Sequence, residues 1–338
     1  MTKNVTVLIA SYNHAPFLSY QLDSLIAQTT PPKRIIVLDD GSTDDTQGIL
    51  ERYKENNSIQ VICHEKNLGV HAALCRLMSE VDTEFFAFAS ADDLLTREWC
   101  DTMASLLEAY PKAKIAISNT FVVEGEITLA TDLIDGSNGA NAGVYGPQEF
   151  VEAVFRIGKL PPSNTIMYRS DIIQDLILPV FSQRRLGPVV DLMLILEIAT
   201  RHPTAYSTKA TGVFFKSLGS YGSSALDIHQ QQHIAERIEQ VSHSGKLLKP
   251  ERFATFVNRL IKYAWVRQAI MRSQSENRAN RKGLRYLWAA IALHAKTLAT
   301  LIAFGRLRYA RLTYLRRRHR VHSLTAVIDE RLLGRLSL

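Results

Sequence analysis

Short, strongly apolar runs alternate with helix-like segments over the first 123 residues. Each run is rich in the β-branched or aromatic residues that buried parallel strands favour, and each is followed by a polar turn. The five runs are Val5–Ala10, Ile35–Leu38, Ile59–Cys63, Phe85–Ala89 and Ile115–Val123. This alternation predicts an α/β fold with a doubly wound, mostly parallel sheet and right-handed crossovers.

The pattern changes after residue 123. Glycine, asparagine, serine and aspartate dominate Glu124–Gly146, so we expect a long surface loop there. Four further elements are expected: a helix from Pro147 to Phe155, a strand-like segment at Asn164–Tyr168, an apolar helix at Val189–Thr200 and a strand or hairpin at Tyr206–Lys216. We therefore divide the chain into a domain at 1–225, with halves 1–123 and 124–225, and a helical basic region at 226–338.

Charge is distributed unevenly along the chain. The net charge is +7, yet residues 272–338 hold 15 Lys/Arg against 3 Asp/Glu, so the remainder is acidic and no nucleic-acid partner is expected. An apolar stripe from Leu284 to Ile302 precedes an arginine cluster at Arg306–Arg320, and the apolar part is too short and too polar to span a bilayer. Two interpretations stay open: the segment 284–320 lies on an anionic membrane surface, or the stripe packs on the preceding domain.

The cysteines and the first residues bear on the compartment. Cys63, Cys75 and Cys100 are odd in number and suit neither a disulfide framework nor a zinc site. The chain enters its first apolar run almost at once and shows no cleavable signal peptide. We expect a cytoplasmic protein, peripheral on the cytoplasmic face of the membrane if the basic segment binds lipid.

Two acidic pairs follow two of the predicted strands. Asp39–Asp40 comes after the second run, and Asp92–Asp93 after the fourth. Because parallel strands end at one edge of a sheet, the pairs can meet around one ligand. Adjacent carboxylates ionise together most readily beside a cation, and Mn²⁺ or Mg²⁺ carrying phosphate oxygens is the natural partner of Asp92 and Asp93. The alternative is a solvated acidic turn that caps the next helix.

Several nucleotide-binding classes are excluded. The chain has no Gly-x-Gly-x-x-Gly after its first strand and no Gly-Lys-Ser/Thr loop, which argues against a dinucleotide dehydrogenase and a P-loop enzyme. A nucleoside diphosphate held through a metal needs neither motif. The histidines His14, His64 and His71 are interpreted as loop or surface residues, because their spacing does not favour a metal site.

Four motifs together carry a resemblance to a known family. They are Val-Leu-Ile-Ala-Ser-Tyr-Asn at 7–13, Val-Leu-Asp-Asp-Gly-Ser-Thr-Asp-Asp-Thr at 37–46, Asn-Leu-Gly at 67–69 and Ser-Ala-Asp-Asp at 90–93. In this order and spacing, residues 4–220 resemble family 2 of the inverting glycosyltransferases. The resemblance implies a GT-A fold, a nucleotide-sugar donor and a divalent metal.

The resemblance also implies roles for single residues. Ala10, Ser11 and Tyr12 would border the nucleotide base, with the Tyr12 ring stacked on it. Asp40 would accept a hydrogen bond from the base, with Asp39 beside it.

The motif at 90–93 departs from the family. Asp92 occupies the last position of the Asp-x-Asp motif and would bind metal and diphosphate, with Asp93 as a second metal candidate. Ser90 stands where the family has its first Asp, followed by Ala91, so a ribose or metal contact is weakened or replaced by a hydroxyl. Lys216 lies where the family often has a segment that reaches the diphosphate.

The catalytic base is expected in the second half. The family places it in a Glu-Asp pair that opens a helix, and Val190–Asp191 fits that position with Val in place of Glu. Asp191 is the sole acid between Gly187 and Ile195, a setting that can raise its pKa toward that of a general base. The alternative is charge complementarity at a helix N-terminus, and Asp171 and Asp175 are rival bases.

These inferences converge on a metal-dependent inverting glycosyltransferase. The expected donor is a UDP-sugar or a close relative, and the expected acceptor is a glycan or lipid-linked glycan of surface polysaccharide synthesis. Two rivals are a non-catalytic nucleotide- or metal-binding module of the same fold and a sugar nucleotidyltransferase, whose glycine- and lysine-bearing first turn is missing here.

Overall fold

The computed structural model describes residues 2–275 except 125, 130–141, 158–162 and 216–227. Lys216, the apolar stripe at 284–302 and the arginine cluster at 306–320 lie outside the described residues. Residues 1–261 form one compact unit and residues 262–338 another. The sequence-based boundary at residue 225 falls inside the first unit.

All five predicted strands are present, with a helix after each of the first four. The strands are β1 (Lys3–Ser11), β2 (Pro32–Asp39), β3 (Ile59–Cys63), β4 (Phe85–Phe88) and β6 (Ile115–Glu124), and the helices are α1 (Ala15–Ile26), α2 (Thr46–Glu51), α3 (Val70–Met78) and α4 (Trp99–Ala109). α1, α2 and α4 bury their apolar residues against one face of the sheet, while α3 packs on the other. The doubly wound α/β prediction is confirmed.

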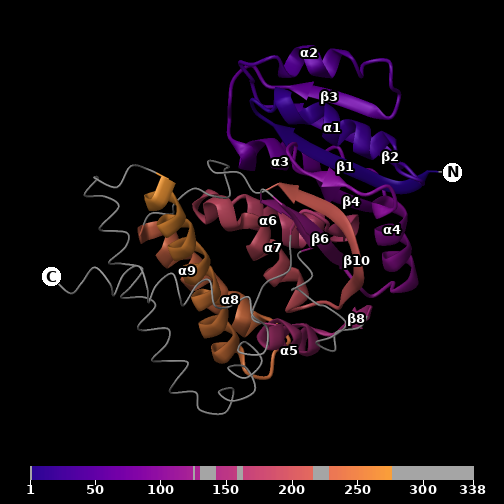
Figure 1. Ribbon diagram of the computed structural model, residues 1–338. Coiled ribbons are helices and arrows are strands. Elements are labelled where there is room, and N and C mark those ends of the chain that lie inside the picture. Colours follow the sequence, from indigo (N-terminus) through magenta and orange to yellow (C-terminus); the bar gives the residue numbers. More distant parts are fainter. Residues whose placement is uncertain (1, 125, 130–141, 158–162, 216–227, 276–338) are drawn as a thin grey trace. The chain divides into compact units, whose positions relative to one another are not determined.

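The sheet is mixed rather than wholly parallel. Its order is β3-β2-β1-β4-β9-β6-β10-β5, and β10 (Thr204–Phe215) runs beside β6 as a long curved strand (Figure 1). β1 is parallel to β2 and β4, whereas β9 (Met167–Arg169) is inserted antiparallel between β4 and β6. The short β5 (Leu94–Leu95) pairs antiparallel with β10. A strand from the second half of the chain thus completes the sheet of the first half.

The prediction of a long surface loop at Glu124–Gly146 was wrong at both ends. β7 (Glu126–Leu129) forms a hairpin with β6, and β8 (Gly143–Tyr145) pairs antiparallel with the start of β10. The glycine-rich composition of this segment does not predict these short strands. They are stabilised by pairing with a long neighbouring strand rather than by a hydrophobic face of their own.

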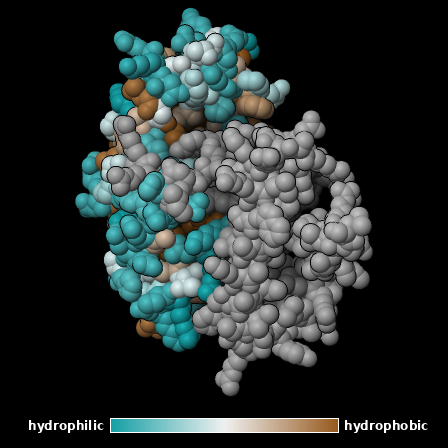
Figure 2. Space-filling model, turned by 90° about the vertical axis from the view of Figure 1, so that its left-hand side faces the viewer, coloured by the Kyte–Doolittle hydropathy of each residue, from teal (hydrophilic) through white to brown (hydrophobic). Residues whose placement is uncertain are grey.

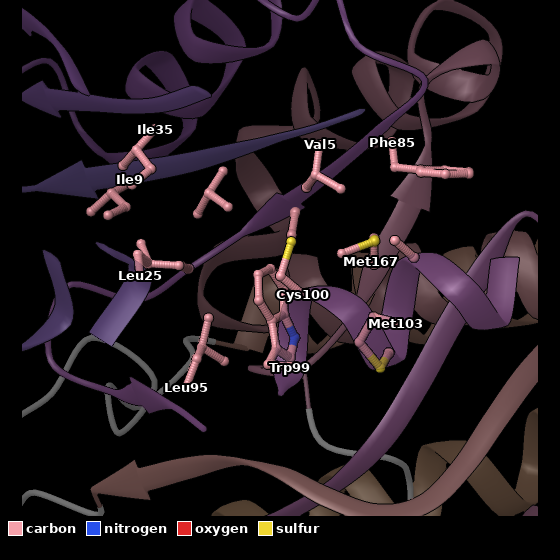
Figure 3. Packing of buried hydrophobic residues seen from close by; sticks show 14 of the residues in the cluster. Val5, Ile9, Leu25, Ile35, Phe85, Leu95, Trp99, Cys100, Met103 and Met167 are labelled. Carbon is pink, nitrogen blue, oxygen red and sulfur yellow. The ribbon is translucent and has the colours of Figure 1, made fainter. Parts of the chain in front are cut away.

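The core beneath β1 shows why the sequence folds this way. Val5, Val7 and Ile9 alternate along β1 and share one face, and all are fully buried. Trp99 and Met103 of α4 pack into the same cluster (Figure 3). The cluster is large and continuous, so it holds the strand ends in fixed positions.

The remaining helices follow residue 146. They are α5 (Pro147–Ile157), α6 (Leu178–Phe181), α7 (Val190–Ala199), α8 (Ile228–Ser244) and α9 (Pro250–Ser275), with 3-10 turns at Ser170–Ile172 and Arg184–Val189 and a π-turn at Ile173–Ile177. Within the described residues, no helix combines the length and the apolar character that crossing a bilayer requires. The face shown in Figure 2 is mostly hydrophilic over its described part, with hydrophobic residues in smaller groups.

A buried ion cluster joins α7 to α8. Glu197 is 2% exposed, and its carboxylate is paired with Arg201 of the same helix end and with Arg237 of α8. Both arginines keep about a quarter of their side chains exposed. Apart from Asp191 in the first turn, the other residues of α7 are apolar, so the arginines neutralise a charge that has little water around it.

Glu197→Ala should therefore lower the free energy of unfolding by about 3–5 kcal/mol, because it leaves two partly buried arginines without their carboxylate. Urea unfolding measures the change. Glu51→Ala is the matched control: Glu51 pairs with Lys54 in an exposed i,i+3 pair, and its loss should change stability by less than about 1 kcal/mol. Equal effects of the two substitutions would contradict the structural role of Glu197.

Candidate active site

The carboxyl ends of β1, β2 and β4 meet at one edge of the sheet and bring the predicted acidic pairs to it. Ser11 at the end of β1 is in register with Asp39 at the end of β2, and the Asp40 N–H donates to the Ser11 carbonyl at 2.8 Å. β4 lies on the other side of β1 and leads into Ser90–Asp93. The shared edge predicted from the sequence is present.

Asp40 is bound from within the chain. Its carboxylate is 3% exposed and accepts hydrogen bonds from the N–H groups of Leu68 (3.0 Å) and Gly69 (2.8 Å), and it lies 2.7 Å from Nδ1 of His64. These bonds hold the segment that opens α3 against the end of β2. Gly41 follows with a φ of +70°, and a Cβ there would lie 2.6 Å from the backbone of Lys66. Both carboxylate oxygens of Asp40 are therefore used by contacts within the chain.

Asp39 is arranged differently. It is fully buried, and its Oδ1 accepts a hydrogen bond from the Ser42 N–H at 3.1 Å. Its Oδ2 has no hydrogen-bond partner among the described residues, and neither has the hydroxyl of the neighbouring Ser11. Buried polar atoms in proteins are nearly always paired, so these two atoms at the sheet edge favour a ligand that supplies the missing partner.

Hydrogen bonds join the turn after β1 to the turn after β2. Asn13, with a φ of +57°, accepts a hydrogen bond from the Thr43 N–H at 2.8 Å and donates its own N–H to Ser42 Oγ at 2.9 Å. Asp44 accepts from the first N–H of α1 at 3.0 Å. Tyr12 is held between these anchors with 41% of its surface exposed, so its ring is available for stacking.

In the Ser90–Asp93 motif, Asp92 and Asp93 have different surroundings. Asp92 is half-buried and makes no hydrogen bond or ion pair with another described residue. Asp93 is 4% exposed and accepts hydrogen bonds from the Phe215 N–H, at 3.0 Å, and from Ser90. Burial raises the pKa of Asp93 to about 7, and the charge of Asp92 acts in the same direction while the two hydrogen bonds oppose it.

The donor set at this edge fits a hard divalent cation with few protein ligands. Among the described residues no group of three or more His, Cys, Asp or Glu side chains could hold a metal. Mg²⁺ and similar ions on nucleotides need only one or two carboxylates, because phosphate oxygens and water complete their coordination. Asp92, partly exposed and unpaired, has the chemistry for that task.

Asp191 lies in the first turn of α7, at the position predicted for a base. Its Oδ1 accepts a hydrogen bond from the Leu192 N–H at 2.7 Å, and Ser163 also hydrogen-bonds to it. Burial raises its pKa, and the hydrogen bonds oppose the shift only in part. The pKa of Tyr168 is raised by burial and by the charge of Asp191.

Ring contacts link β9 to the strand that leads into the Ser90–Asp93 motif. Tyr168 of β9 stacks on Phe86 with centroids 5.2 Å apart and meets Phe88 at 5.8 Å. Phe88 ends β4, two residues before Ser90. The antiparallel insertion of β9 therefore brings a strand from the second half of the chain against the strand that leads into the Ser90–Asp93 motif.

The rival bases have other surroundings. Asp171 is exposed and paired with Lys114, and Asp175 is exposed. Asp191, in contrast, is partly buried.

Sequence reasoning missed three partners: His64 beside Asp40, Ser163 beside Asp191, and the Phe215 N–H on Asp93. Of these, only His64 could have been predicted from the sequence, because it directly follows β3, which ends at the same edge of the sheet as β2. The surface interpretation was wrong for His71, which is 8% exposed, hydrogen-bonded to the Phe181 carbonyl and packed edge-on against the Phe181 ring.

Comparison with solved structures places the fold. TarS of S. aureus, residues 1–349 in complex with UDP, superposes with a TM-score of 0.58 at 17% identity, covering 82% of this chain and 81% of that chain. The same protein in complex with UDP-GlcNAc gives a TM-score of 0.57 at 18% identity, covering 87% and 81%. The predicted GT-A fold is confirmed.

Sequence comparison finds bacterial glycosyltransferases. Identity is 33% over 96 residues with a processive diacylglycerol beta-glycosyltransferase of Mycoplasma pneumoniae, covering 28% of each chain. It is 35% over 103 residues with the putative glycosyltransferase EpsH of Bacillus subtilis, covering 30% of each. These matches span less than a third of either relative. The family model "Glycosyl transferase family 2" matches residues 6–170, so this part of the chain is similar to glycosyl transferase family 2.

Proposed function

We propose that the chain is an inverting glycosyltransferase that moves a sugar from a nucleoside diphosphate sugar, UDP-linked in the first instance, to a hydroxyl of an acceptor. The observation that carries this proposal is that two acids at one sheet edge keep carboxylate oxygens without a hydrogen-bond partner among the described residues. Asp39 Oδ2 is buried without a partner, and Asp92 is partly exposed and unpaired among the described residues. One suits a nucleotide base and the other a metal-bound diphosphate.

The base contact belongs to Asp39 rather than to Asp40. Asp40 uses both carboxylate oxygens within the chain, whereas Asp39 keeps a bare acceptor beside the Ser11 hydroxyl. A ring N–H of uracil can donate to that acceptor while the exposed Tyr12 ring stacks on the base, with Ala10 and Ser11 at its border. UDP and UDP-GlcNAc in the complexes of S. aureus TarS support a uridine donor.

The diphosphate is assigned to Asp92 and Lys216. When bound, Mn²⁺ or Mg²⁺ would neutralise the diphosphate and so stabilise it as a leaving group. Asp92 would hold the ion together with the phosphate oxygens. Lys216 follows Phe215 directly in the chain, and Phe215 is hydrogen-bonded to the metal motif, which supports a phosphate contact from this lysine.

Asp191 is the proposed base. Ser163 and the Leu192 N–H orient its carboxylate, and burial makes it more basic than an ordinary aspartate. It takes the proton of the acceptor hydroxyl, whose oxygen attacks the anomeric carbon on the face opposite the departing diphosphate. Attack from that face inverts the anomeric configuration. A non-catalytic module would have no use for an enclosed, basic carboxylate, which is why the enzyme is favoured.

The acceptor is proposed to be a glycan or lipid-linked glycan of surface polysaccharide synthesis, on the cytoplasmic face of the membrane. The net charge of +12 over residues 272–338 supports attachment to an anionic surface through 284–320.

A screen of nucleotide sugars for thermal stabilisation, with and without Mn²⁺, tests donor binding. A donor at 100 times its dissociation constant should add about 2.7 kcal/mol. Asp39→Asn should then weaken UDP binding by about 10- to 100-fold, because Nδ2 replaces an acceptor with a donor that faces the uracil N–H. Isothermal titration of UDP with Mn²⁺ measures this.

Asp40→Asn is the comparison for Asp39→Asn. It should lower thermal stability, because an amide cannot accept every bond that the segment 64–69 makes to Asp40. If Asp40→Asn abolishes UDP binding in a folded protein while Asp39→Asn does not, the base contact belongs to Asp40.

Asp191→Asn should keep donor affinity and reduce turnover by about 10²–10⁴-fold. In the unmodified chain, activity should rise with pH through the raised pKa of Asp191, since only the ionised carboxylate accepts a proton. Release of UDP across a pH series measures both effects. Asp175→Asn, an exposed rival, serves as the control and should stay near wild-type activity. Loss of donor binding with intact turnover at saturation would make Asp191 a binding residue.

Membrane attachment is tested with vesicles. The full chain should sediment with anionic liposomes at low salt and with neutral ones poorly, because each basic residue at such a surface contributes about 1 kcal/mol. Replacing Arg316, Arg317 and Arg318 with Gln should weaken binding by up to about 100-fold. Salt-independent binding, or equal binding to neutral liposomes, would count against the electrostatic attachment.

A further inference from the structure

Asp93 connects two parts of the site that are far apart in sequence. One oxygen accepts the N–H of Phe215, 122 residues later in the chain, and Ser90 also hydrogen-bonds to the carboxylate. With only 4% of its surface exposed, the side chain has little access to solvent. The carboxylate oxygens of Asp93 accept hydrogen bonds from within the protein, whereas those of Asp92 accept none from another described residue.

The backbone around Asp93 makes the same connection. β5 starts at the next residue, and its Leu94 and Leu95 pair antiparallel with Val213 and Gly212 of β10. Thr96 continues the contact through its N–H, which donates to the Thr211 carbonyl at 2.9 Å. Phe215 is the last residue of β10, so the Asp93 carboxylate takes the N–H at the point where the strand ends. The metal motif is thereby fastened to the end of β10.

Ser90 explains why a carboxylate is tolerated in this buried position. Its hydroxyl can donate to Asp93, which a carboxylate at the same place could not do. An aspartate at position 90 would put a second negative charge against a buried one, and two such groups cannot both ionise readily. The departure of this chain from Asp-x-Asp is therefore coupled to the inward use of Asp93.

We infer that Asp93 is a positioning residue and not a metal ligand: the Ser90–Asp93–Phe215 bonds fix the metal motif against the end of β10, so that Asp92 alone presents its carboxylate to the metal-bound diphosphate. This replaces the metal role expected for Asp93 from the sequence, and it rests on the proposed function of Asp92. It also gives Ser90 a role that requires no ribose or metal contact.

Three variants separate a positioning residue from a ligand. Asn at position 93 can accept from Phe215 with its oxygen and donate to Ser90 with its nitrogen, while Leu can do neither. We expect Asp93→Asn to keep turnover within about 10-fold of wild type and Asp93→Leu to lose about 10- to 100-fold, the usual effect of removing a supporting residue. Asp92→Asn is the ligand control and should lose Mn²⁺ binding.

Two measurements report on these variants. Electron paramagnetic resonance of free Mn²⁺, titrated in the presence of UDP, should give the same half-saturating Mn²⁺ for Asp93→Asn as for wild type, within about twofold. Hydrogen exchange at the Phe215 amide needs no ligand: it should stay protected in Asp93→Asn and exchange faster in Asp93→Leu. If Asp92→Asn binds Mn²⁺ normally, the proposed metal site fails, while the exchange result still decides whether Asp93 anchors β10.

A double substitution tests the coupling to Ser90. Ser90→Asp alone should lower the melting temperature, because its charge faces Asp93. In the Asp93→Asn background the same change should be tolerated, since Asn can donate to the new carboxylate.

The inference is overturned if Asp93→Asn raises the half-saturating Mn²⁺ as much as Asp92→Asn does, because Asp93 would then be a ligand. It is also overturned if Asp93→Leu leaves turnover and Phe215 exchange unchanged, or if Ser90→Asp has the same effect with and without Asp93→Asn.

Discussion

The parallel pairing of β1 with β2 and β4 is the constraint on which the site depends. It places the ends of three strands at one edge and sets Ser11 beside Asp39 in register. A shift of one residue in this pairing would move Val5, Val7 and Ile9 to the opposite face of the sheet, where Thr6 and Leu8 are now buried, and both layers would have to repack. The hydrophobic core below β1 therefore also determines where the polar groups at the edge lie.

Most of the polar motif residues at that edge serve the scaffold. Asp40 holds the start of α3, Asn13 and Asp44 join two turns, and Asp93 holds the end of β10. Among the described residues, three groups at this edge have no hydrogen-bond partner: one oxygen of Asp39, the Ser11 hydroxyl and the carboxylate of Asp92. Such an arrangement keeps the few free groups in fixed positions before a ligand arrives, and little ordering remains to be done on binding.

The sequence predicted the strands and the positions of the acids for the same reason. Buried parallel strands such as Val5–Ala10 are continuous apolar runs, and polar residues directly after them must lie at the sheet edge. It predicted a strand-like segment at Asn164–Tyr168, which overlaps β9, but it could not predict that this strand is inserted antiparallel between β4 and β6, because the partners of so short a strand are not encoded in its own pattern. Nor could it distinguish Asp39 from Asp40, or Asp92 from Asp93. That distinction depends on backbone N–H groups supplied by residues 28 to 122 positions away.

The insertion of β9 between β4 and β6 bears on how the chain folds during synthesis. Until residues 167–169 have been made, β4 presents an unpaired edge, and β6 has no partner through which to join the sheet of β1 to β4. Open strand edges invite pairing with other chains, and contacts between residues far apart in sequence form slowly. Residues 1–123 therefore lack the strand that joins β4 to β6, although they hold all four sequence motifs. An evolutionary exchange of acceptor halves would have to carry β9 and β10 with it, and new specificities are more readily obtained by changes in the segments between them.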